Sequence, residues 1–560
     1  RTPNELLNLK ICDPAMGSGA FLVQAIRYMS DKLVETWHKI SENTNDPITI
    51  PFGAKSTGNP EERLLPAEYN EQYKYAKRYV AMECIYGVDI NPLAVEIAKL
   101  SIWLETLAKD LPFTFIDHKL LCGDSLLGIT NIDDLEKVTQ IGIYDLFSSC
   151  DAKKIGHAID ARLEIETMPD FSVKDRKIKV EKLKRSNEEL KDVKSHLTKL
   201  FKDHALDKIY SKSKTKLNGD PIEFDNSFHW LLNFSEVFVS VDKQKAGFDA
   251  IIGNPPFLGG QKLTGFFGEE YREYLVEMLA NQMRGSADLV AYFFLRAVNL
   301  LKNSGNFGLL ATNTIAQGDT RETGLSQVVK NSKIFAAFPD EPWEGNATVT
   351  TSRVHICKTD KWFGPKILWD NSVEMISPFL SAEDDRKPFV LKANENKSFQ
   401  GSIVLGMGFT LSEEEAFEFI KKDPKNKDVL YPYLNGQDLN SSPTQSPSRW
   451  VINFWDWPIE RARQYEDLFK IVEEKVKPER EKLNREIRRK YWWQFAEKTP
   501  RLYHLIGRYR LFEKHPNGYE YPNDPIKNVI VISRVTKHLS YLIVNNDSIW
   551  TANTAIYIIA

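Results

Sequence analysis

The sequence predicts an α/β protein whose first part is built on a parallel sheet. Three short apolar runs end in an acidic residue, at Asp13, Asp89 and Asp124, and turn residues follow each run. A fourth apolar run, Phe248 to Ile252, has the length and branching of a strand buried on both faces. Beyond residue 360 the pattern changes to mixed strands, prolines and aromatics, which predicts a second, α+β domain.

Length and composition exclude several classes. A chain of 560 residues predicts three or four domains, and 42% hydrophobic with 27% charged residues is ordinary for a soluble protein. The net charge of -3 means that any nucleic-acid surface must be local. Five scattered cysteines without a Cys-x-x-Cys pair predict a reducing, cytoplasmic setting without structural zinc. No apolar run approaches the ~18 residues of a membrane span, and no metal is predicted.

The first strand, residues 9–12, leads into a glycine-rich turn. Gly17 and Gly19 allow a tight turn and close backbone approach, and apolar positions then recur at helical spacing from Phe21. The turn is neither Gly-x-Gly-x-x-Gly nor a phosphate loop. The strand-end acid Asp13 therefore suits a ligand with an amino group better than one with a pyrophosphate.

The second and third strands also end in acids. Asp89 follows residues 85–88, where a Rossmann-like fold binds a ribose diol. The alternative is that Asp89 or Asn91 caps the helix that follows. Asp124 repeats the pattern after residues 119–122, so the acids form a constellation.

The fourth strand stops in Asn254-Pro255-Pro256-Phe257. Two prolines fix the backbone and remove its donors, so that the Asn254 oxygen and the Pro255 carbonyl face the site beside Phe257. This set suits a planar group with an NH2, which donates two hydrogen bonds while its ring stacks. The alternative is a turn after a core strand, with Phe257 as packing.

These motifs, in this order, resemble a known family. Residues 13–22, 87–92, 123–126 and 253–257 are similar to the motifs of gamma-class amino-group DNA methyltransferases, which use S-adenosylmethionine to modify the exocyclic amine of adenine. The order resembles large type IIG/IIL restriction-modification enzymes and related phage-defence (DISARM- or BREX-like) proteins. One position departs from the pattern, because Met16 stands where the family has Cys.

The resemblance implies a Rossmann-like class I methyltransferase sheet and a role for each matching residue. The residues implied to hold S-adenosylmethionine are Asp13, Pro14, Ala15, Gly17, Ser18, Gly19, Phe21, Asp89, Ile90, Asn91, Asp124 and Ser125. Those implied to hold the flipped target base are Asn254, Pro255, Pro256 and Phe257. The family has a further motif before the glycine loop. Since twelve residues precede Asp13 and the chain opens on Arg1 rather than Met, we expect a piece of a longer protein.

An insertion separates the third and fourth motifs. Leu183, Leu190 and Leu197 recur every seven residues, which predicts a charged helical hairpin or coiled-coil arm over residues 151–225. Its cations could clamp DNA, but a solvated face is the commoner explanation of such charges, and we favour it. The cations concerned are Lys182, Lys184, Arg185 and Lys191.

The remaining strands of the catalytic domain are predicted at residues 305–312, 333–338 and 351–358, with a helix at 286–294. The predicted domains are therefore a catalytic domain (1–150 and 226–360), the insertion (151–225) and a target recognition domain (361–560), incomplete at its C-terminus.

Residues 431–439 and 448–454 resemble the opening of such a recognition domain. From 461 to 540 there are 19 Lys/Arg against 11 Asp/Glu, with aromatics interleaved, which fits a DNA surface. A solvated helix from 465 to 490 would explain about a third of these charges. The candidate DNA contacts are Arg449, Arg488, Arg489, Lys490, Trp492, Arg501, Arg508, Arg510, Arg534 and Lys537.

The sequence thus predicts a site-specific DNA adenine methyltransferase, the modification component of a restriction-modification or antiphage system. Its expected partners are double-stranded DNA, other defence subunits and a fused or separate nuclease, with no membrane. Two alternatives stay open: a non-catalytic DNA-binding subunit, and a protein-glutamine methyltransferase, which lacks a basic, aromatic-rich tail. No cysteine is placed after a proline as ring-carbon methylation of cytosine would need, and no nuclease motif is found.

Overall fold

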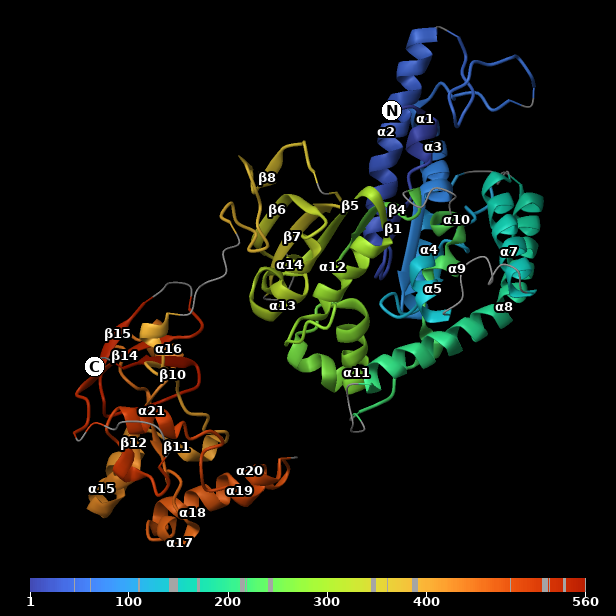
Figure 1. Ribbon diagram of the computed structural model, residues 1–560. Coiled ribbons are helices and arrows are strands. Elements are labelled where there is room, and N and C mark those ends of the chain that lie inside the picture. Colours follow the sequence, from blue (N-terminus) through green and yellow to red (C-terminus); the bar gives the residue numbers. More distant parts are fainter. Residues whose placement is uncertain are drawn as a thin grey trace. The chain divides into compact units, whose positions relative to one another are not determined.

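The computed structural model divides the chain into two compact units, residues 1–386 and 387–560 (Figure 1). It describes all residues except 45, 61, 109–110, 140–149, 169–171, 212–216, 218, 240–244, 344–348, 360, 385–390, 484, 516–521, 523, 537–539 and 559–560. Each unit is described by itself. None of the described helices combines the length and the apolar character needed to span a bilayer.

The first unit is organised around a nine-stranded sheet among its described residues. Its strands, in spatial order, are β3 (Leu120–Cys122), β2 (Ile85–Asp89), β1 (Ile11–Asp13), β4 (Phe248–Gly253), β5 (Leu301–Thr312), β7 (Thr350–Cys357), β6 (Lys333–Pro342), β8 (Lys366–Leu368) and β9 (Asn371–Val373). The strands from β3 to β5 pair in parallel, so the carboxyl ends of β1 to β4 meet at one edge. The strands predicted from the apolar runs are confirmed.

Helices cover both faces of this sheet, and each face has its own core. One core joins α2 (Ala20–Thr44), α3 (Tyr69–Cys84) and α4 (Pro92–Glu105) to the sheet, and Ala250 and Ile252 of β4 pack against it. Phe248 and Ile251 belong to the core on the other side, with α12 (Leu289–Leu300). Because β4 serves both cores, Ala250, Ile251 and Ile252 are apolar in succession rather than alternating with polar residues, while Asp249 near the start of the strand pairs with Lys302.

The insertion forms the predicted helical hairpin. Helix α8 (Val173–Tyr210) packs along α7 (Cys150–Thr167), and Figure 1 shows the pair beside the sheet. Leu190 and Leu197 of α8 are buried in the same core as Phe248, so α8 lies on the unit for much of its length. A Ser172 capping box begins α8.

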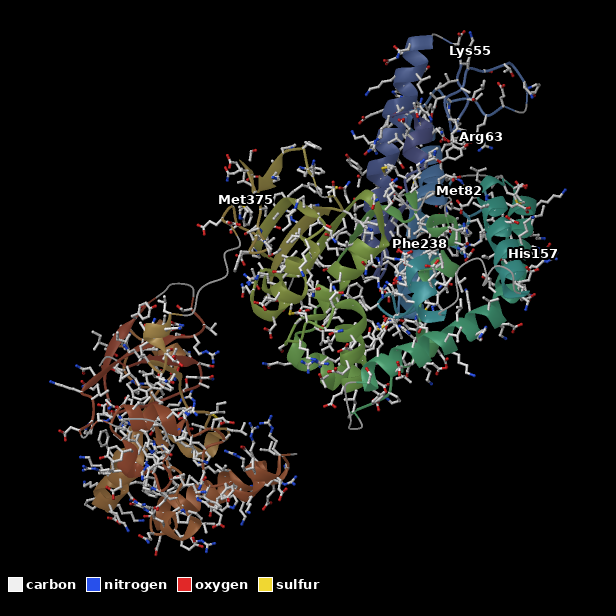
Figure 2. The ribbon with its side chains drawn as sticks, viewed as in Figure 1. Lys55, Arg63, Met82, His157, Phe238 and Met375 are labelled. Carbon is white, nitrogen blue, oxygen red and sulfur yellow. The ribbon has the colours of Figure 1, made fainter. Side chains whose placement is uncertain are left out.

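Buried ion pairs join α7 to the segment just before β3 and to α10. Glu166 binds His118 Nε2 at 2.6 Å and Lys119 Nζ at 2.8 Å, and Arg162 pairs with Glu236 at 2.9 Å. In Figure 2, Phe238 lies inside the first unit, whereas His157 lies on the outer side of α7. The insertion is therefore fixed to the catalytic domain by charge as well as by apolar packing.

The sheet continues past residue 360, where the sequence predicted the domain to end. Strand β8 pairs with β6, and β9 pairs with β8. The compact unit accordingly ends at residue 386. The other helices of this unit are α1 (Pro3–Leu7), α5 (Ile132–Thr139), α9 (Trp230–Asn233), α10 (Ser235–Phe238), α11 (Gly260–Tyr274), α13 (Gly318–Thr323) and α14 (Leu325–Val328), with shorter turns η1 (Phe224–Asn226), η3 (Leu275–Leu279) and η4 (Asn313–Ala316).

The second unit mixes short strands and helices around an aromatic core that contains Trp455, Trp457 and Trp550. Its described strands form two four-stranded sheets. One sheet contains β10 (Ser398–Gln400), β17 (Thr554–Tyr557), β14 (Asn528–Ser533) and β15 (Leu542–Asn545), and the other contains β11 (Thr410–Leu411), β13 (Arg449–Ile452), β12 (Leu430–Leu434) and β16 (Ile549–Trp550). The predicted α+β character is confirmed.

The helix expected from 465 to 490 is broken into three, α18 (Glu466–Lys475), α19 (Lys477–Glu481) and α20 (Glu486–Lys490). Pro478 sits in the first turn of α19, where a proline starts a helix but cannot continue one. The remaining helices are α15 (Glu413–Lys422), α16 (Gly436–Ser441), α17 (Ile459–Ala462) and α21 (Pro500–Leu505), with turns η5 (Lys392–Asn394), η6 (Met407–Phe409), η7 (Pro424–Asp428) and η8 (Tyr509–Leu511).

Candidate functional site

The glycine-rich turn after β1 holds two strand ends together. Gly17 and Gly19 have φ of +53° and +80°, which side chains with a Cβ rarely adopt. The Gly17 N–H donates to Asp89 Oδ2 at 2.8 Å, and this bond joins the ends of β1 and β2. A Cβ at Gly19 would lie 3.2 Å from that of Ala98, so the glycine also lets α4 approach.

Asp13 is buried at the end of β1. Its Oδ1 accepts the Ala15 N–H at 3.0 Å, and a Cβ on Gly253 would lie 2.5 Å from the same oxygen. Burial is the main reason that the pKa of Asp13 rises from 3.8 to about 7, with a smaller contribution from Asp89. A carboxyl group with a pKa near 7, beside the end of β4, is suited to bind a cationic amino group.

The second strand end presents Asp89 and Ile90. Asp89 Oδ1 accepts the Asn91 N–H at 2.8 Å, so both carboxylate oxygens are held by backbone donors. Ile90 is 53% exposed, which leaves a large apolar side chain facing the site. Asn91 accepts the Leu93 N–H at 2.9 Å and caps α4. The cap is the alternative raised from the sequence, and the predicted cofactor contact of Asn91 stays a prediction.

Asp124 is fixed by two donors after β3. Its Oδ1 accepts the Leu126 N–H at 3.0 Å and its Oδ2 accepts the Tyr271 O–H at 2.8 Å. Burial raises the pKa of Asp124, and the Tyr271 hydrogen bond opposes this rise. Tyr271 could not be identified from the sequence, because this α11 residue lies 147 positions from Asp124 and no local pattern marks it.

Asn254 follows β4 and carries the most informative atom of the site. Its Oδ1 is buried and accepts no hydrogen bond from the described residues. A buried acceptor without a donor is costly, which identifies a position suited to an NH donor of a ligand.

Asp288 supports the loop that carries Phe257. Its Oδ1 accepts the Leu258 N–H at 3.2 Å and the Val290 N–H at 3.1 Å, so it ties the loop to the first turn of α12. The helix at 286–294 is predicted from the sequence, but no role is predicted there for Asp288. An aspartate just before an apolar helical run is a capping signal and could have identified it.

The strand ends enclose a cavity of about 260 Å³. It is lined by Pro14, Ala15, Asp89, Ile90, Gly123, Asp124, Ser125, Leu126, Asn254, Pro256, Phe267, Tyr271, Leu289 and Phe293. Half of the predicted site residues, eight of sixteen, thus come together around one space. Other predicted residues are not part of the lining: Asp13, Gly17, Ser18, Gly19, Phe21, Asn91, Pro255 and Phe257. Gly17 acts from behind the lining, through its hydrogen bond to Asp89.

The predicted DNA contacts in the second unit divide by exposure. Six are exposed and Arg488 is half-buried, while Lys537 lies outside the described residues. The exposed ones are Arg449, Arg489, Lys490, Arg501, Arg510 and Arg534.

Two of the ten predicted DNA contacts, Trp492 and Arg508, are wrong. Trp492 is 7% exposed and packs against Phe469, with ring centroids 5.4 Å apart. Arg508 is 8% exposed, and its Nη1 donates to the Ser548 carbonyl at 3.0 Å. Both side chains are held inside the core of the unit, where they cannot reach a nucleic acid.

Comparisons with known proteins agree on one class for the first unit. Residues 83–336 match the family described as Eco57I restriction-modification methylase, and residues 2–122 match the family described as MmeI, DNA-methyltransferase domain. The matched regions contain all four strand ends that surround the cavity.

Two curated relatives match part of this chain at low sequence identity. A putative type II restriction enzyme and methyltransferase of Methanocaldococcus jannaschii is 24% identical over 364 residues, which cover 56% of this chain and 27% of that protein. The type II restriction enzyme and methyltransferase RM.Eco57I of Escherichia coli is 28% identical over 151 residues, covering 25% and 13%. The chain thus spans about a quarter or less of the length of these relatives.

A solved structure of the Type IIL restriction-modification enzyme MmeI in complex with DNA has a similar fold. The TM-score is 0.54 at 14% sequence identity, and the match covers 100% of this chain and 57% of that chain. At this identity the likeness concerns the fold.

Proposed function

We propose, from the premise that residues 2–336 form a DNA-methyltransferase domain of the restriction-modification type, that the protein methylates the exocyclic amine of adenine at a specific DNA site. It would serve as the modification component of a restriction-modification or related antiphage system. The observation that supports an exocyclic amine as the target is Asn254 Oδ1, which is buried and accepts no hydrogen bond within the described part of the chain. Asn254 lines the same cavity as Asp89, Ile90 and Asp124.

The residues around the cavity fit S-adenosylmethionine. The Asp13 carboxylate, behind the glycine turn, would bind the amino group of the methionine part. Asp89 has lone pairs left for the ribose hydroxyls, Ile90 offers an apolar surface to the adenine ring, and Asp124 accepts from the ring amine. When bound, this cofactor supplies a methyl group on a sulfonium that is already a strong electrophile. No metal is proposed, and no cluster of three metal-ligating side chains occurs among the described residues.

The protein's own contribution is to align and activate the target nitrogen. The lone pair of an aromatic amine is delocalised into the ring. Asn254 Oδ1 and the Pro255 carbonyl would accept its two hydrogens, which favours the more tetrahedral and more nucleophilic nitrogen. Phe257 would stack on the base. Reaching the amine requires the nucleotide to be flipped out of the duplex, at a cost of a few kcal/mol.

The second unit favours DNA over a protein substrate. Its exposed cations, among them Arg449, Arg489 and Arg534, offer contacts to phosphates that a small amide substrate would not need. The likeness of the fold to MmeI, solved in complex with DNA, supports the same choice.

The test is transfer of labelled methyl groups to plasmid DNA by the purified protein, followed by nucleoside analysis and sequencing of the modified sites. We expect methyl-adenine at one short motif. Asn254→Ala should lower kcat by about 100-fold or more while binding of S-adenosylmethionine is retained, because it removes an acceptor used in the transition state.

The matched control is Asn131→Ala, which removes an asparagine that accepts the Asp134 N–H at 2.9 Å and does not line the cavity. Methyl-cytosine would overturn the adenine target. Cofactor binding without transfer to DNA would overturn the DNA substrate and favour a subunit or a protein substrate.

A further inference from the structure

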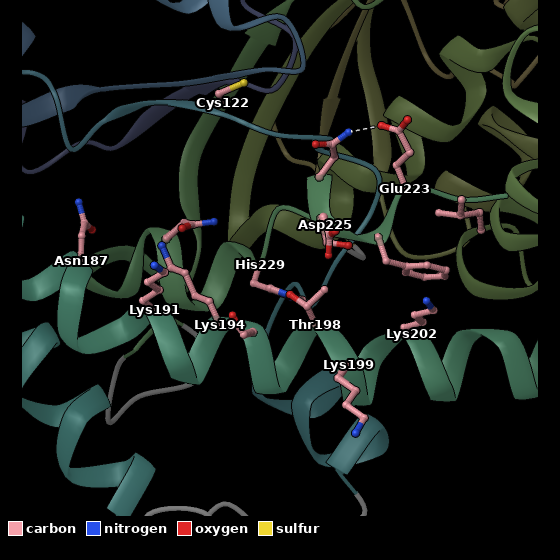
Figure 3. A pocket seen from close by; sticks show the side chains of 16 residues that line it. Cys122, Asn187, Lys191, Lys194, Thr198, Lys199, Lys202, Glu223, Asp225 and His229 are labelled. Carbon is pink, nitrogen blue, oxygen red and sulfur yellow. Dashed lines mark hydrogen bonds between the residues drawn. The ribbon is translucent and has the colours of Figure 1, made fainter. Parts of the chain in front are cut away.

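A second and larger cavity, of about 1010 Å³, lies beside helix α8 (Figure 3). Lys191, Lys194 and Lys202 line it from α8, and Glu223 and Asp225 line it from the segment that precedes α9. Figure 3 shows these three lysines on the side of α8 that faces the two acids. The methyltransferase mechanism uses none of these side chains.

The three lysines differ from Lys182 and Arg185 of the same helix. Lys182 pairs with Glu164, and Arg185 pairs with Glu189 at 3.2 Å. By contrast, no ion pair to Lys191, Lys194 or Lys202 is found among the described residues. Lys182 and Arg185 are thus partly neutralised by the protein. Lys191 and Lys194 have no anionic partner among the described residues, and Lys202 lies over the ring of Phe224, 6.0 Å from its centroid.

The cavity wall is positive overall. Four lysines line it, Lys199 being the fourth, against the carboxylates of Glu223 and Asp225. Glu223 is already engaged, because it accepts the Asn226 side-chain N–H at 2.7 Å. The field in this space therefore favours an anion.

Lys194 and its neighbours are arranged as donors. Burial, and secondarily Arg162, lowers the pKa of Lys194 to about 8, so an anion bound there would relieve a real electrostatic cost. His229 accepts the Ile129 N–H through Nδ1 at 3.2 Å, and burial lowers its pKa to about 4. The neutral ring must then carry its proton on Nε2 and donate to Thr198 Oγ1 at 3.0 Å. The Thr198 hydroxyl is left free to donate into the cavity.

The spacing indicates an extended anion. Lys191 and Lys202 are separated by eleven residues, which is about 16 Å along a helix. Successive phosphates of one DNA strand advance by about 3.4 Å along the duplex axis, so this stretch passes several of them. A single phosphate would need only one of the lysines, whereas a sugar-phosphate chain would use all three.

We propose that the groove formed by Lys191, Lys194, Thr198 and Lys202 binds the phosphate backbone of the DNA substrate. This rests on the proposed function in taking DNA as the polyanion. The helical insertion is then a second DNA-binding surface, fixed to the catalytic domain by the packing of α8 and the ion pairs of α7.

The test is the salt dependence of duplex binding by the purified protein with Lys191, Lys194 and Lys202 each replaced by Gln. Each lost phosphate contact lowers the slope of log affinity against log salt by about 0.9, or about 2.7 for three. The ratio of the wild-type duplex affinity to that of the variant should then fall by about 40-fold between about 50 and 200 mM salt. S-adenosylmethionine affinity should not change, and the melting temperature should not fall, because the replacement of Lys194 removes a buried charge.

The matched control replaces Lys174, Lys177 and Lys184 by Gln. These exposed lysines lie on the same helix, outside the cavity, and change the net charge equally. An equal slope for wild type and the cavity variant, or an equal loss in both triple variants, would overturn the groove. If the cavity variant loses binding of labelled ATP but binds the duplex as the wild type does, the DNA groove is also overturned, in favour of a free nucleotide. Because binding is measured without turnover, a protein that fails to methylate adenine still tests the groove.

Discussion

The two units place their functional side chains in different ways. In the first unit, Asp13, Asp89 and Asp124 stand at the ends of adjacent parallel strands, and backbone N–H groups hold each of them. In the second unit, the candidate DNA contacts such as Arg489 and Arg534 are exposed on short helices and strand ends. The positions of the acids in the first unit are thus determined by strand order and by backbone hydrogen bonds. The surface of the second unit depends instead on which cations are not buried in its core.

The strongest test of this contrast is Arg508→Ala in the second unit. Arg508 looks like a surface cation in sequence but is buried among the rings of Tyr431, Tyr503 and Trp550. Its loss leaves a cavity and frees the Ser548 carbonyl, so we expect about 2–4 kcal/mol less stability. Chemical denaturation measures the change.

Arg510→Ala, two residues further on, is the control, because its side chain is exposed. It should leave the unfolding midpoint where it is. If both variants behave alike, Arg508 is not the structural cation described above.

The features that could be predicted from the sequence are those with a local signal. The strand ends at Asp13, Asp89, Asp124 and Asn254 were predicted because an apolar run that stops in a polar residue is a local signal, and parallel strands bring such ends to one edge. The contact of Tyr271 with Asp124 could not be predicted, because it depends on how α11 packs against the sheet.

The burial of Trp492 and Arg508 shows the same limit in the second unit. An alternation of rings and cations has the same composition on a nucleic-acid surface as in an aromatic core. Only tertiary packing decides which side chains stay outside, here the contacts of Trp492 with Phe469 and of Arg508 with Ser548.

The pH dependence of cofactor binding tests the strand-end chemistry. The pKa of Asp13 is about 7, above its ordinary 3.8, because the carboxyl is buried. Only the charged form attracts the amino group, so the dissociation constant of S-adenosylmethionine should rise by up to about tenfold per pH unit below 7. Calorimetry between pH 5 and 8 would measure this dissociation constant.

The same group has the opposite effect on the stability of the cofactor-free protein. A raised pKa favours the folded state below the ordinary value of 3.8, and this contribution is lost as the pH rises to about 7. Asp13→Asn should remove both dependences. A wild-type dissociation constant that is flat across this range would contradict the assignment of Asp13.

Tyr271→Phe tests whether α11 positions Asp124. Removing the hydroxyl takes away the hydrogen bond to Oδ2, so the pKa of Asp124 should rise further and cofactor affinity should fall about fivefold, or about 1 kcal/mol. Fluorescence titration with S-adenosylmethionine measures the change.

Tyr274→Phe is the matched control, since its O–H donates to the Leu126 carbonyl at 3.0 Å rather than to Asp124. A purely structural role would weaken the two variants alike in stability and in affinity. Loss of affinity in Tyr271→Phe alone identifies Tyr271 as a positioning residue.

The smallest expected effect belongs to the exposed surface of the second unit. Arg449 faces Tyr433 across β12 and β13 and lines a cavity of about 480 Å³ with Gln437. If it contacts one phosphate, Arg449→Gln should weaken duplex binding only a few-fold, lower the salt slope by about one and leave melting temperature and recognition motif unchanged. A relaxed base at one position of the motif would instead make Arg449 a base reader. Because a strand pair fixes its backbone, this one contact of the second unit would then be as well determined as the strand-end site of the first.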